Sequence, residues 1–528
     1  MRIISIGHAG LLIEADDVRI LCDPWFLPAF HGSWFPFPRN DRLNRELLAR
    51  IEHPDYLYIS HQHGDHLDAP WLREHVARDL VVLLPAFETD ELERDLRHLG
   101  FSRFARLHDA EAVRLTPRLE VAIHVATSVA DGPGGDSALV VSDGESRVLN
   151  QNDCHLRDAQ ALTRHGPIDV HLLQFSGAIW WPFVYEFDER RLAALARAKR
   201  QGQYARALRY AQVVNARVVV GMAGPPAFLD EELFGLNMIT GEELSIFPDQ
   251  KDFHDFLVER SRDSVVLLPG STLTVDAASM AVEHATDPDV PFIDKAAYLR
   301  TYQRDWEPWL EQLKRTWPAT TTDLLSKLRA WWHPLLAQAP GLREAIGSGC
   351  LLVSDPDRIY VDFPAGEVRR HAGEAYTHRF TIPRPLLELV VQERAVDWSN
   401  RLFLSCRFRA WRAGAYSEHL YAFFKSLSPQ RMARAEAEAA RARVEAPEVS
   451  MIALGSYRVE RWCPHRQADL AEFGVLENDE VVCTLHGWRF DARTGRCRNA
   501  RGRDLVVRSG ADEVEGHGER VSPDPSSN

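Results

Sequence analysis

The sequence predicts a multidomain α/β protein, and three observations support this fold class. The chain has 528 residues, which is more than one hydrophobic core holds and suggests three or four domains. Short apolar runs alternate with helical stretches over residues 1–275, as in α/β domains. Beyond residue 275 the pattern becomes helical, then mixed, and ends in short strands separated by Gly and Asp turns.

The first predicted domain, residues 1–275, contains many short strands. Their apolar runs are RIISIG, GLLIE, VRILCD, YLYIS, LVVLLP, LEVAIHVA, ALVVSD, SRVLNQ, VHLLQF and ARVVVGM. Two stretches between them have helical periodicity, DAPWLREHVARDL and ERRLAALARAKRQGQYARALRYAQVV.

Five further segments follow in the sequence. Residues 276–342 predict a helical connector rich in Trp, and residues 343–428 predict a small α+β domain. Residues 429–448 are polar with no evident apolar face, which predicts a solvated linker helix. Residues 449–508 predict a domain of short strands, and residues 509–528 have the composition of a disordered tail.

The composition excludes several classes of protein. Asp and Glu number 76 against 62 Lys and Arg, so the formal charge of −14 argues against a general nucleic-acid or anionic-membrane binder. No apolar run reaches the roughly 20 residues of a membrane span, and the N-terminus resembles a strand and turn more than a signal peptide. Seven cysteines are too few for a disulfide scaffold. We therefore expect a cytoplasmic protein.

A pair of cysteine–histidine motifs near the C-terminus predicts a metal or cluster site. Cys463-Pro-His465 is followed by Cys483-Thr-Leu-His486, so each half offers one thiolate and one imidazole. Two Cys and two His can bind zinc, but zinc-finger spacing pairs Cys with Cys and His with His. A [2Fe-2S] cluster with one iron on two Cys and the other on two His needs ligands split in this way. Both interpretations stay open from spacing alone.

The residues and spacing of these motifs resemble those of the Rieske domain family. CPHRxADL followed by CxxHGW is similar to the oxygenase-associated type. The resemblance implies an all-β domain whose [2Fe-2S] cluster is held by Cys463, His465, Cys483 and His486, with Trp488 packed beside it. It also implies a soluble electron carrier.

A second candidate site is a histidine-rich loop that follows the predicted strand YLYIS. It contains His61, His63, Asp65 and His66, so three imidazoles and one carboxylate lie within six residues. His61 and His63 can face one side while Asp65 and His66 face another. This arrangement suits a site for two metal ions.

The same loop, HxHxDH, resembles the signature of the metallo-β-lactamase fold, and the segments GHAGLLIE and VRILCDPW resemble its opening strands. The resemblance implies an αββα sandwich over residues 1–275. It implies that Asp153, in RVLNQNDCH, bridges the metals, and that Asp23 is a carboxylate behind the metal ligands.

The sequence departs from that family at two ligand positions. Hydrolases of this fold have a further His before the bridging Asp, where this chain offers Asp131 or Asp136. They have another His on a late strand, where Met222 stands here, and His155 is the candidate substitute. These departures disfavour a hydrolytic dizinc centre and favour an open non-haem iron site of one or two ions, with zinc as the alternative metal.

Together the two sites predict a Rieske-coupled iron monooxygenase, because hydrolysis uses no electrons and dioxygen activation does. The pairing resembles the CMP-N-acetylneuraminate hydroxylase family with the domain order reversed, and residues 343–428 faintly resemble a sterol-carrier fold. We expect NAD(P)H, a reductase and a ferredoxin or cytochrome b5-like donor to reduce the cluster. The expected substrate is small and polar, a nucleotide sugar or a biosynthetic amine or amino-acid intermediate. The predicted catalytic residues are His61, His63, Asp65, His66 and Asp153.

Two alternatives remain, and the route of the electrons is open. The first is a metal-dependent hydrolase of the lactonase or phosphodiesterase type with a redox-sensing Rieske domain. The second is an electron-transfer or scaffold protein with an empty sandwich site. Electrons pass either within one chain or between the chains of a homo-oligomer.

Overall fold

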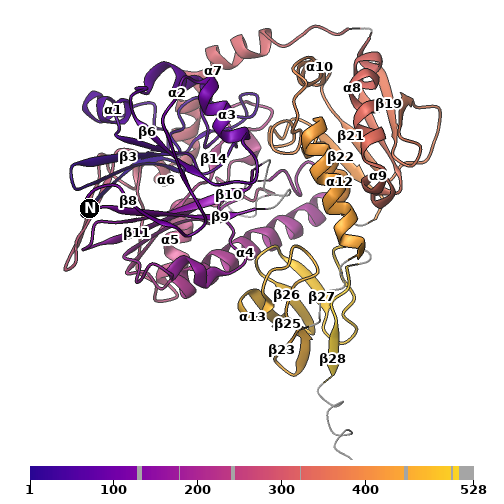
Figure 1. Ribbon diagram of the computed structural model, residues 1–528. Helices are drawn as coiled ribbons and strands as arrows, with labels where there is room; N and C mark the ends of the chain where they lie inside the picture. The colour runs from indigo at the N-terminus through magenta and orange to yellow at the C-terminus, as the bar shows by residue number, and fades with distance from the viewer. Residues whose placement is uncertain are drawn as a thin grey trace, which may run out of the picture. The chain divides into compact units, whose positions relative to one another are not determined.

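The computed structural model describes residues 1–127, 134–177, 179–239, 244–321, 323–414, 416–444, 450–500 and 503–509. They form two compact units, Met1–Glu445 and Ala446–Asn528, which are described separately (Figure 1). The predicted tail beyond Ser509 and the candidate ligand Asp131 lie outside the described residues.

The first unit begins with an eight-stranded sheet. Strands β3, β5, β6 and β7, at one end of the sheet, pair in parallel, and the other neighbours pair antiparallel. In spatial order the strands are β17 (Met280–Glu283), β16 (Thr272–Val275), β1 (Arg2–Gly7), β2 (Gly10–Ala15), β3 (Val18–Cys22), β5 (Tyr56–Tyr58), β6 (Val81–Pro85) and β7 (Phe104–Leu107). Strand β17 carries the sheet beyond the expected boundary at residue 275.

A seven-stranded sheet faces it. Strands β11, β12, β13 and β15 are parallel, and β8, β9 and β10 are antiparallel. In spatial order the strands are β15 (Ser264–Val265), β13 (Val218–Met222), β12 (Val170–Gln174), β11 (Arg147–Asn152), β10 (Asp136–Ser142), β9 (Glu120–Ala126) and β8 (Ala112–Arg114).

The two sheets enclose one core and carry helices on their outer faces. Ile13 and Leu83 of the first sheet share a buried cluster with Ile123 and Leu172 of the second. Figure 1 shows three helices on one side of the paired sheets, α1 (Arg45–Glu52), α2 (Ala69–His75) and α3 (Glu91–His98). The other side carries α4 (Glu189–Val214) and α5 (Gln250–Val258). This is the expected αββα sandwich.

The rest of the first unit is a helix-covered sheet of five strands. In spatial order they are β20 (Glu367–Arg370), β19 (Asp357–Asp362), β18 (Gly349–Ser354), β21 (His378–Thr381) and β22 (Arg409–Arg412). Its helices are α8 (Leu324–Gln338), α9 (Pro340–Ile346), α10 (Arg384–Gln392), α11 (Glu418–Lys425) and α12 (Pro429–Val444). Helices α6 (Val290–Ile293) and α7 (Lys295–Arg315) precede it. Helix α8 was expected in the connector, but Leu328 and Trp332 are buried in the core of this region.

Helix α12 differs from the expected solvated linker. Met432, Ala435 and Ala439 are buried in the same core. The carboxylate of Glu436 accepts hydrogen bonds from the backbone amides of Gly341 and Leu342 at the start of α9. The apolar face was missed because two of its three members are alanines, which give a weak hydrophobic signal beside many charged residues.

The second unit is rich in short strands, as expected for a Rieske domain. One three-stranded sheet contains β23 (Met451–Leu454), β24 (Tyr457–Glu460) and β28 (Val507–Ser509). The other contains β25 (Gly474–Glu477), β26 (Glu480–Cys483) and β27 (Trp488–Asp491), with the short helix α13 (Leu470–Phe473) before it.

Candidate metal centres

The candidate residues of the sandwich lie where strands of both sheets end. His8 follows β1, Asp23 follows β3, and His61 of the histidine-rich loop lies three residues after the end of β5. Asp153 follows β11 of the second sheet. Because β1, β3 and β5 run in one direction, their carboxyl ends meet at one edge of the sheet.

The backbone turns sharply at this edge. His8, Asp23, Asn152 and Ala223 all have positive φ, between 39° and 54°. Non-glycine residues in this region are uncommon, and they gather at functional sites where surrounding structure holds them. Four strand ends with this conformation therefore mark the edge as a candidate site.

One group of three ligands consists of His61, His63 and Asp153. Their candidate ligand atoms lie within 4.8 Å of one another. Nε2 of His61 is 2.8 Å from Nδ1 of His63, and the two rings stand at 82°. Burial, reinforced by the neighbouring imidazoles, holds the pKa of His61 well below its usual range. The ring is therefore neutral, which is the form that binds a metal.

The second group consists of His8, Asp65 and His66, and all three are buried. Nε2 of His8 lies 3.0 Å from a carboxylate oxygen of Asp65. Burial would raise the pKa of Asp65, but the hydrogen bond from His8 and the nearby imidazoles lower it. Nε2 of His66 is 3.5 Å from the carboxylate of Asp153, so Asp153 lies between the two groups.

Hydrogen bonds behind the ligands orient their rings. Asp23 is fully buried and accepts bonds from the backbone amide and hydroxyl of Ser60, at 2.7 and 2.6 Å. The same carboxylate lies 2.9 Å from Nδ1 of His66. A proton on Nδ1 leaves the Nε2 lone pair of His66 for a metal, as is typical of ligating histidines.

The donor set fits a metal pair. Nε2 of His63, Nε2 of His66 and one oxygen each of Asp65 and Asp153 are buried without a hydrogen-bond partner in the described part of the chain. Buried polar atoms without partners are costly. A set of imidazoles and carboxylates suits iron or zinc.

The structure also shows what stands at the two departures from the family pattern. Asp136 begins β10, and one of its oxygens is 3.3 Å from Nδ1 of His61. At the late strand, the amide of Ala223 donates to the carbonyl of His8 at 3.0 Å, so His8 lies beside the position without a histidine. Sequence reasoning missed His8, although it follows a strand that ends at this edge. His155 belongs to neither group, and its ring lies parallel to Tyr210 at 6.4 Å.

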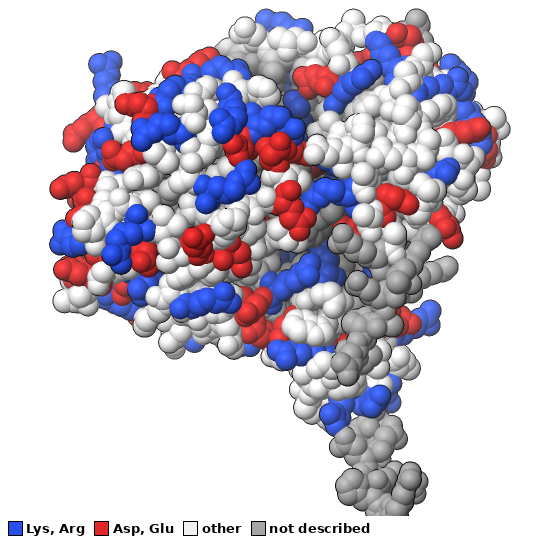
Figure 2. All heavy atoms as spheres, viewed as in Figure 1, with Lys and Arg blue, Asp and Glu red and all other residues white. Residues whose placement is uncertain are grey.

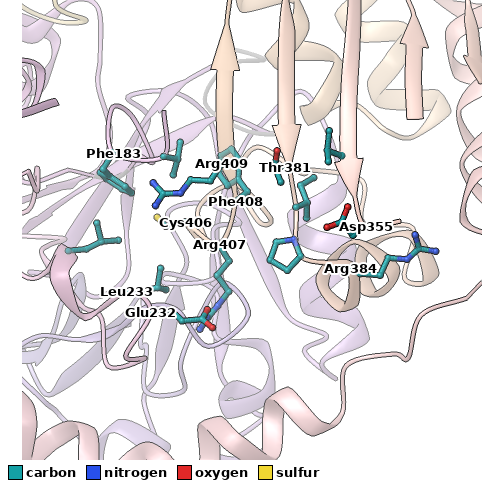
Figure 3. Close-up of a pocket in the computed structure, with 15 residues that line it drawn as sticks. Phe183, Glu232, Leu233, Asp355, Thr381, Arg384, Cys406, Arg407, Phe408 and Arg409 are labelled. Atoms are coloured by element: carbon teal, nitrogen blue, oxygen red, sulfur yellow. The ribbon is translucent and has the colours of Figure 1, made fainter. Parts of the chain in front are cut away.

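Within the first unit, the five-stranded region contacts the sandwich near its metal loop through two arginines. Arg407 donates through Nε to the hydroxyl of Ser33 at 3.0 Å, in a turn whose Ala29 and Phe30 flank Gly64 of the metal loop. Arg431 donates to the carboxylate of Glu91 on α3 at 2.9 Å. A cavity of about 500 Å³ opens beside Arg407 (Figure 3).

The cluster motifs of the second unit are brought together from two loops. Cys463 follows β24, and Cys483 ends β26. The neighbouring thiol of Cys483, together with burial, raises the pKa of Cys463. The rings of His465 and His486 lie 4.8 Å apart. Two neighbouring thiols and two imidazoles fit the mixed ligand set of a Rieske cluster.

Two neighbours complete this site. Trp488 stacks on His465 at 4.0 Å with the rings 8° from parallel. Cys497, which sequence reasoning passed over, is buried and close enough to Cys463 to raise its pKa further.

Three family models match the chain. They are a Beta-lactamase superfamily domain over residues 18–222, an Rv3818-like, SCP2-like domain over residues 324–441, and a Rieske [2Fe-2S] domain over residues 442–507.

Whole proteins and solved structures give further similarities. A protein of Mycobacterium tuberculosis strain H37Rv, named as a Rieske 2Fe-2S iron-sulfur protein, is 42% identical over 96% of this chain and 99% of its own length. Cytidine monophosphate-N-acetylneuraminic acid hydroxylase of Gorilla gorilla gorilla is 23% identical over 59% of this chain and 51% of its own. The crystal structure of CmlA, a diiron β-hydroxylase from Streptomyces venezuelae, is 18% identical with a TM-score of 0.34, and covers 52% of this chain and 54% of its own.

Proposed function

The chain belongs to the family of Rieske 2Fe-2S iron-sulfur proteins represented in Mycobacterium tuberculosis, and we propose that it is a Rieske-coupled non-haem iron monooxygenase. It uses dioxygen and electrons from NAD(P)H to hydroxylate or otherwise oxidise a small polar substrate. In such an enzyme the cluster supplies single electrons and the iron activates dioxygen.

The observation that carries this proposal is the pairing of two ligand sets in one chain. The sandwich groups His8, His61, His63, Asp65, His66 and Asp153 at one edge. The second unit groups Cys463, His465, Cys483 and His486. A hydrolase needs only the first set. An enzyme that reduces dioxygen needs electrons delivered to the metal, which gives the second set a purpose.

The surrounding residues have supporting roles in this proposal. His61, His63 and Asp153 hold one metal, and His8, Asp65 and His66 hold the other. Asp23 and Ser60 fix the ring orientation behind them. The five-stranded region contacts the turn beside the metal loop through Arg407, and we assign it a wall of the substrate site.

The similarity to a hydroxylase supports the reaction class. The gorilla relative is named for hydroxylation of a cytidine-monophosphate-linked acidic sugar, and it matches 59% of this chain. At 23% identity this similarity supports an oxygenase without assigning the same substrate. A nucleotide sugar or a biosynthetic amine or amino-acid intermediate remains our proposal.

The proposed electron donors are a ferredoxin or a cytochrome b5-like protein with an NAD(P)H reductase. Among the described residues, no helix is long and apolar enough to cross a membrane. On the face shown in Figure 2, acidic and basic side chains intermingle.

An anaerobic reductive titration tests the proposal without knowledge of the substrate. The iron-loaded full chain should accept one electron at the cluster and at least one more at the sandwich site. Cys463→Ala/Cys483→Ala should no longer accept the electron at the cluster. His61→Ala/His63→Ala should no longer accept electrons at the sandwich site, while the cluster absorption persists. A wild-type chain that accepts electrons only at the cluster would contradict the proposal.

A metal-dependent hydrolase is the second candidate, because the sandwich matches the Beta-lactamase superfamily model and its ligands also suit zinc. In that case the sandwich would take up zinc and accept no electrons. The Rieske domain would then act as a redox sensor.

A further inference from the structure

Arg206, on helix α4, is a buried cation without a counter-ion at ion-pair distance in the described part of the chain. Its residue is 8% exposed. Its side chain makes one hydrogen bond there, a long contact of 3.4 Å to the amide oxygen of Gln174, and its Nε has no partner. A buried guanidinium is strongly destabilising unless opposite charge and hydrogen bonds compensate it.

Other buried arginines of the same unit are compensated. Arg384 pairs with Asp357 at 2.5 Å and Glu388 at 2.8 Å, and Arg407 pairs with Asp230 at 2.7 Å. Figure 3 shows these two arginines at the cavity beside the five-stranded sheet. These two buried arginines thus have carboxylate partners, whereas no carboxylate of the described residues contacts Arg206.

Arg206 lies next to the metal edge of the second sheet. Gln174, its hydrogen-bond partner, ends β12, and the register of β11 and β12 sets Asn152 opposite Leu173. Gln174 therefore lies one residue beyond this pair, at the end of the second sheet where Asp153 follows β11. One turn further along α4, the hydroxyl of Tyr210 donates to the carbonyl of Leu156 at 2.6 Å.

Two further buried polar atoms without partners belong to residues close in the chain to Gln174 and Arg206. The side-chain oxygen of Gln203 and the hydroxyl of Ser176 are buried and have no hydrogen-bond partner among the described residues. Gln203 precedes Arg206 by three residues, so both side chains lie on one face of α4. Ser176 follows Gln174 by two residues. We call Gln174, Ser176, Gln203 and Arg206 the α4 cluster.

The positive charge of Arg206 is poorly compensated by the groups around it. Burial lowers the pKa of Arg206, and the Tyr210 phenol and the Asp153 carboxylate oppose this only in part. Among the described residues Asp153 makes no ion pair with Arg206, and one of its carboxylate oxygens lies 3.5 Å from Nε2 of His66. An arginine fork binds carboxylates and phosphates through two parallel hydrogen bonds, and the hydroxyl of Ser176 can donate a further one.

We propose that the α4 cluster binds an oxyanion, a carboxylate or a phosphate, beside the metal centre. That this oxyanion belongs to the substrate rests on the function proposed above. The site then anchors the anionic group of a small polar molecule while another part of it faces the metals.

Calorimetric titration of the full chain with inorganic phosphate and, separately, with acetate tests the proposal. The wild type should bind at least one of the two, and the tighter of them identifies the anion class. Arg206→Met should weaken that binding at least about tenfold, equal to 1.4 kcal/mol. Arg206→Lys keeps the charge but loses the two parallel hydrogen bonds of the guanidinium. Its affinity should lie between those of the wild type and Arg206→Met.

A matched control makes the same change in charge elsewhere. Arg190→Met removes an exposed arginine from the same helix and should leave the affinity unchanged. The titration is repeated after metal removal by a chelator, and binding should persist. Equal affinity in wild type and Arg206→Met, binding lost on chelation alone, or no binding of either anion by the wild type would each overturn the proposal.

This experiment fails or succeeds independently of the oxygenase proposal. It involves no turnover, electron donor or particular metal. A zinc-loaded chain that consumes no dioxygen would defeat the proposed function, and the loss of phosphate or acetate affinity in Arg206→Met would still stand.

Discussion

The two metal-binding sites of this chain are assembled in different ways. The cluster site uses two short motifs, and each supplies one thiol and one imidazole from a single loop. The sandwich site collects ligands from the ends of several strands, from His8 at the first to Asp153 after β11. A site built from local motifs is visible in a sequence, whereas a site built by the pairing of distant strands is visible only in part.

The largest expected effect is loss of the cluster with no change in the metal content of the sandwich. Cys463→Ala should remove the cluster and all of its visible absorption, because one iron loses half of its protein ligands. The metal content of the sandwich should be unchanged. Absorption and iron analysis of the purified variant measure both.

Cys497→Ala is the control for that experiment. Its thiol lies near Cys463 without belonging to the predicted ligands, so the absorption should persist. Loss of the cluster in Cys497→Ala would show that the loop motifs do not define the site alone.

The strand-end site is broken most directly at His8. His8→Ala should lower metal affinity of the sandwich more than 100-fold, beyond the effect of losing an outer hydrogen bond. His155→Ala is the matched control and should keep wild-type affinity, because His155 lies outside both ligand groups. Competition with a chelator measures the affinities. The reverse ranking would restore His155 as the ligand.

A smaller effect is expected behind the ligands. Asp23→Asn keeps the size of the side chain but removes the charge that faces Nδ1 of His66. Metal affinity should fall about 10- to 100-fold, while the cluster absorption stays constant. Unchanged affinity would mean that the Asp23 carboxylate does not tune the site.

Acid should weaken the sandwich through its buried histidines. Burial lowers the pKa of His171 to about 3, so the folded chain keeps this ring neutral. The unfolded chain protonates it below about pH 6.5. The unfolded state thus binds more protons between pH 6.5 and pH 3, and stability falls as the pH falls through this window.

His171→Gln tests this effect. Between pH 7 and pH 5, His171 should contribute a loss on the order of 2 kcal/mol in the free energy of unfolding, and the variant should lack that part of the slope. Denaturant titrations at the two pH values measure it. Identical slopes would assign the acid sensitivity to other groups.

Most of the architecture could be predicted because its signals are local. Alternating apolar runs predict the strands of the sandwich, and both sheets confirm the expected fold class. Helix α12 was mistaken for a solvated linker because its buried face consists of Met432 and two alanines. Helix α8 was assigned to a connector because its partners, the strands of the five-stranded sheet, follow it in the chain.

The candidate sites show the same limit. The loop from His61 to His66 is contiguous, so its ligand character is evident in the sequence. His8 is a single histidine 53 residues before His61, and nothing near it in the chain suggests a metal. Only the parallel course of β1, β3 and β5 brings it to Asp65. Arg206 likewise has no carboxylate partner among the described residues only because of the tertiary packing around it, which no sequence pattern records.

The metal content of Cys463→Ala/Cys483→Ala decides whether the sandwich of this Rieske protein is an iron site for dioxygen. This variant is expressed with both iron and zinc available and purified without oxygen. Because it lacks the cluster, any bound metal belongs to the sandwich site. We predict one or two irons per chain. Zinc without iron would contradict the oxygenase and favour the hydrolase, and a chain without metal would contradict both.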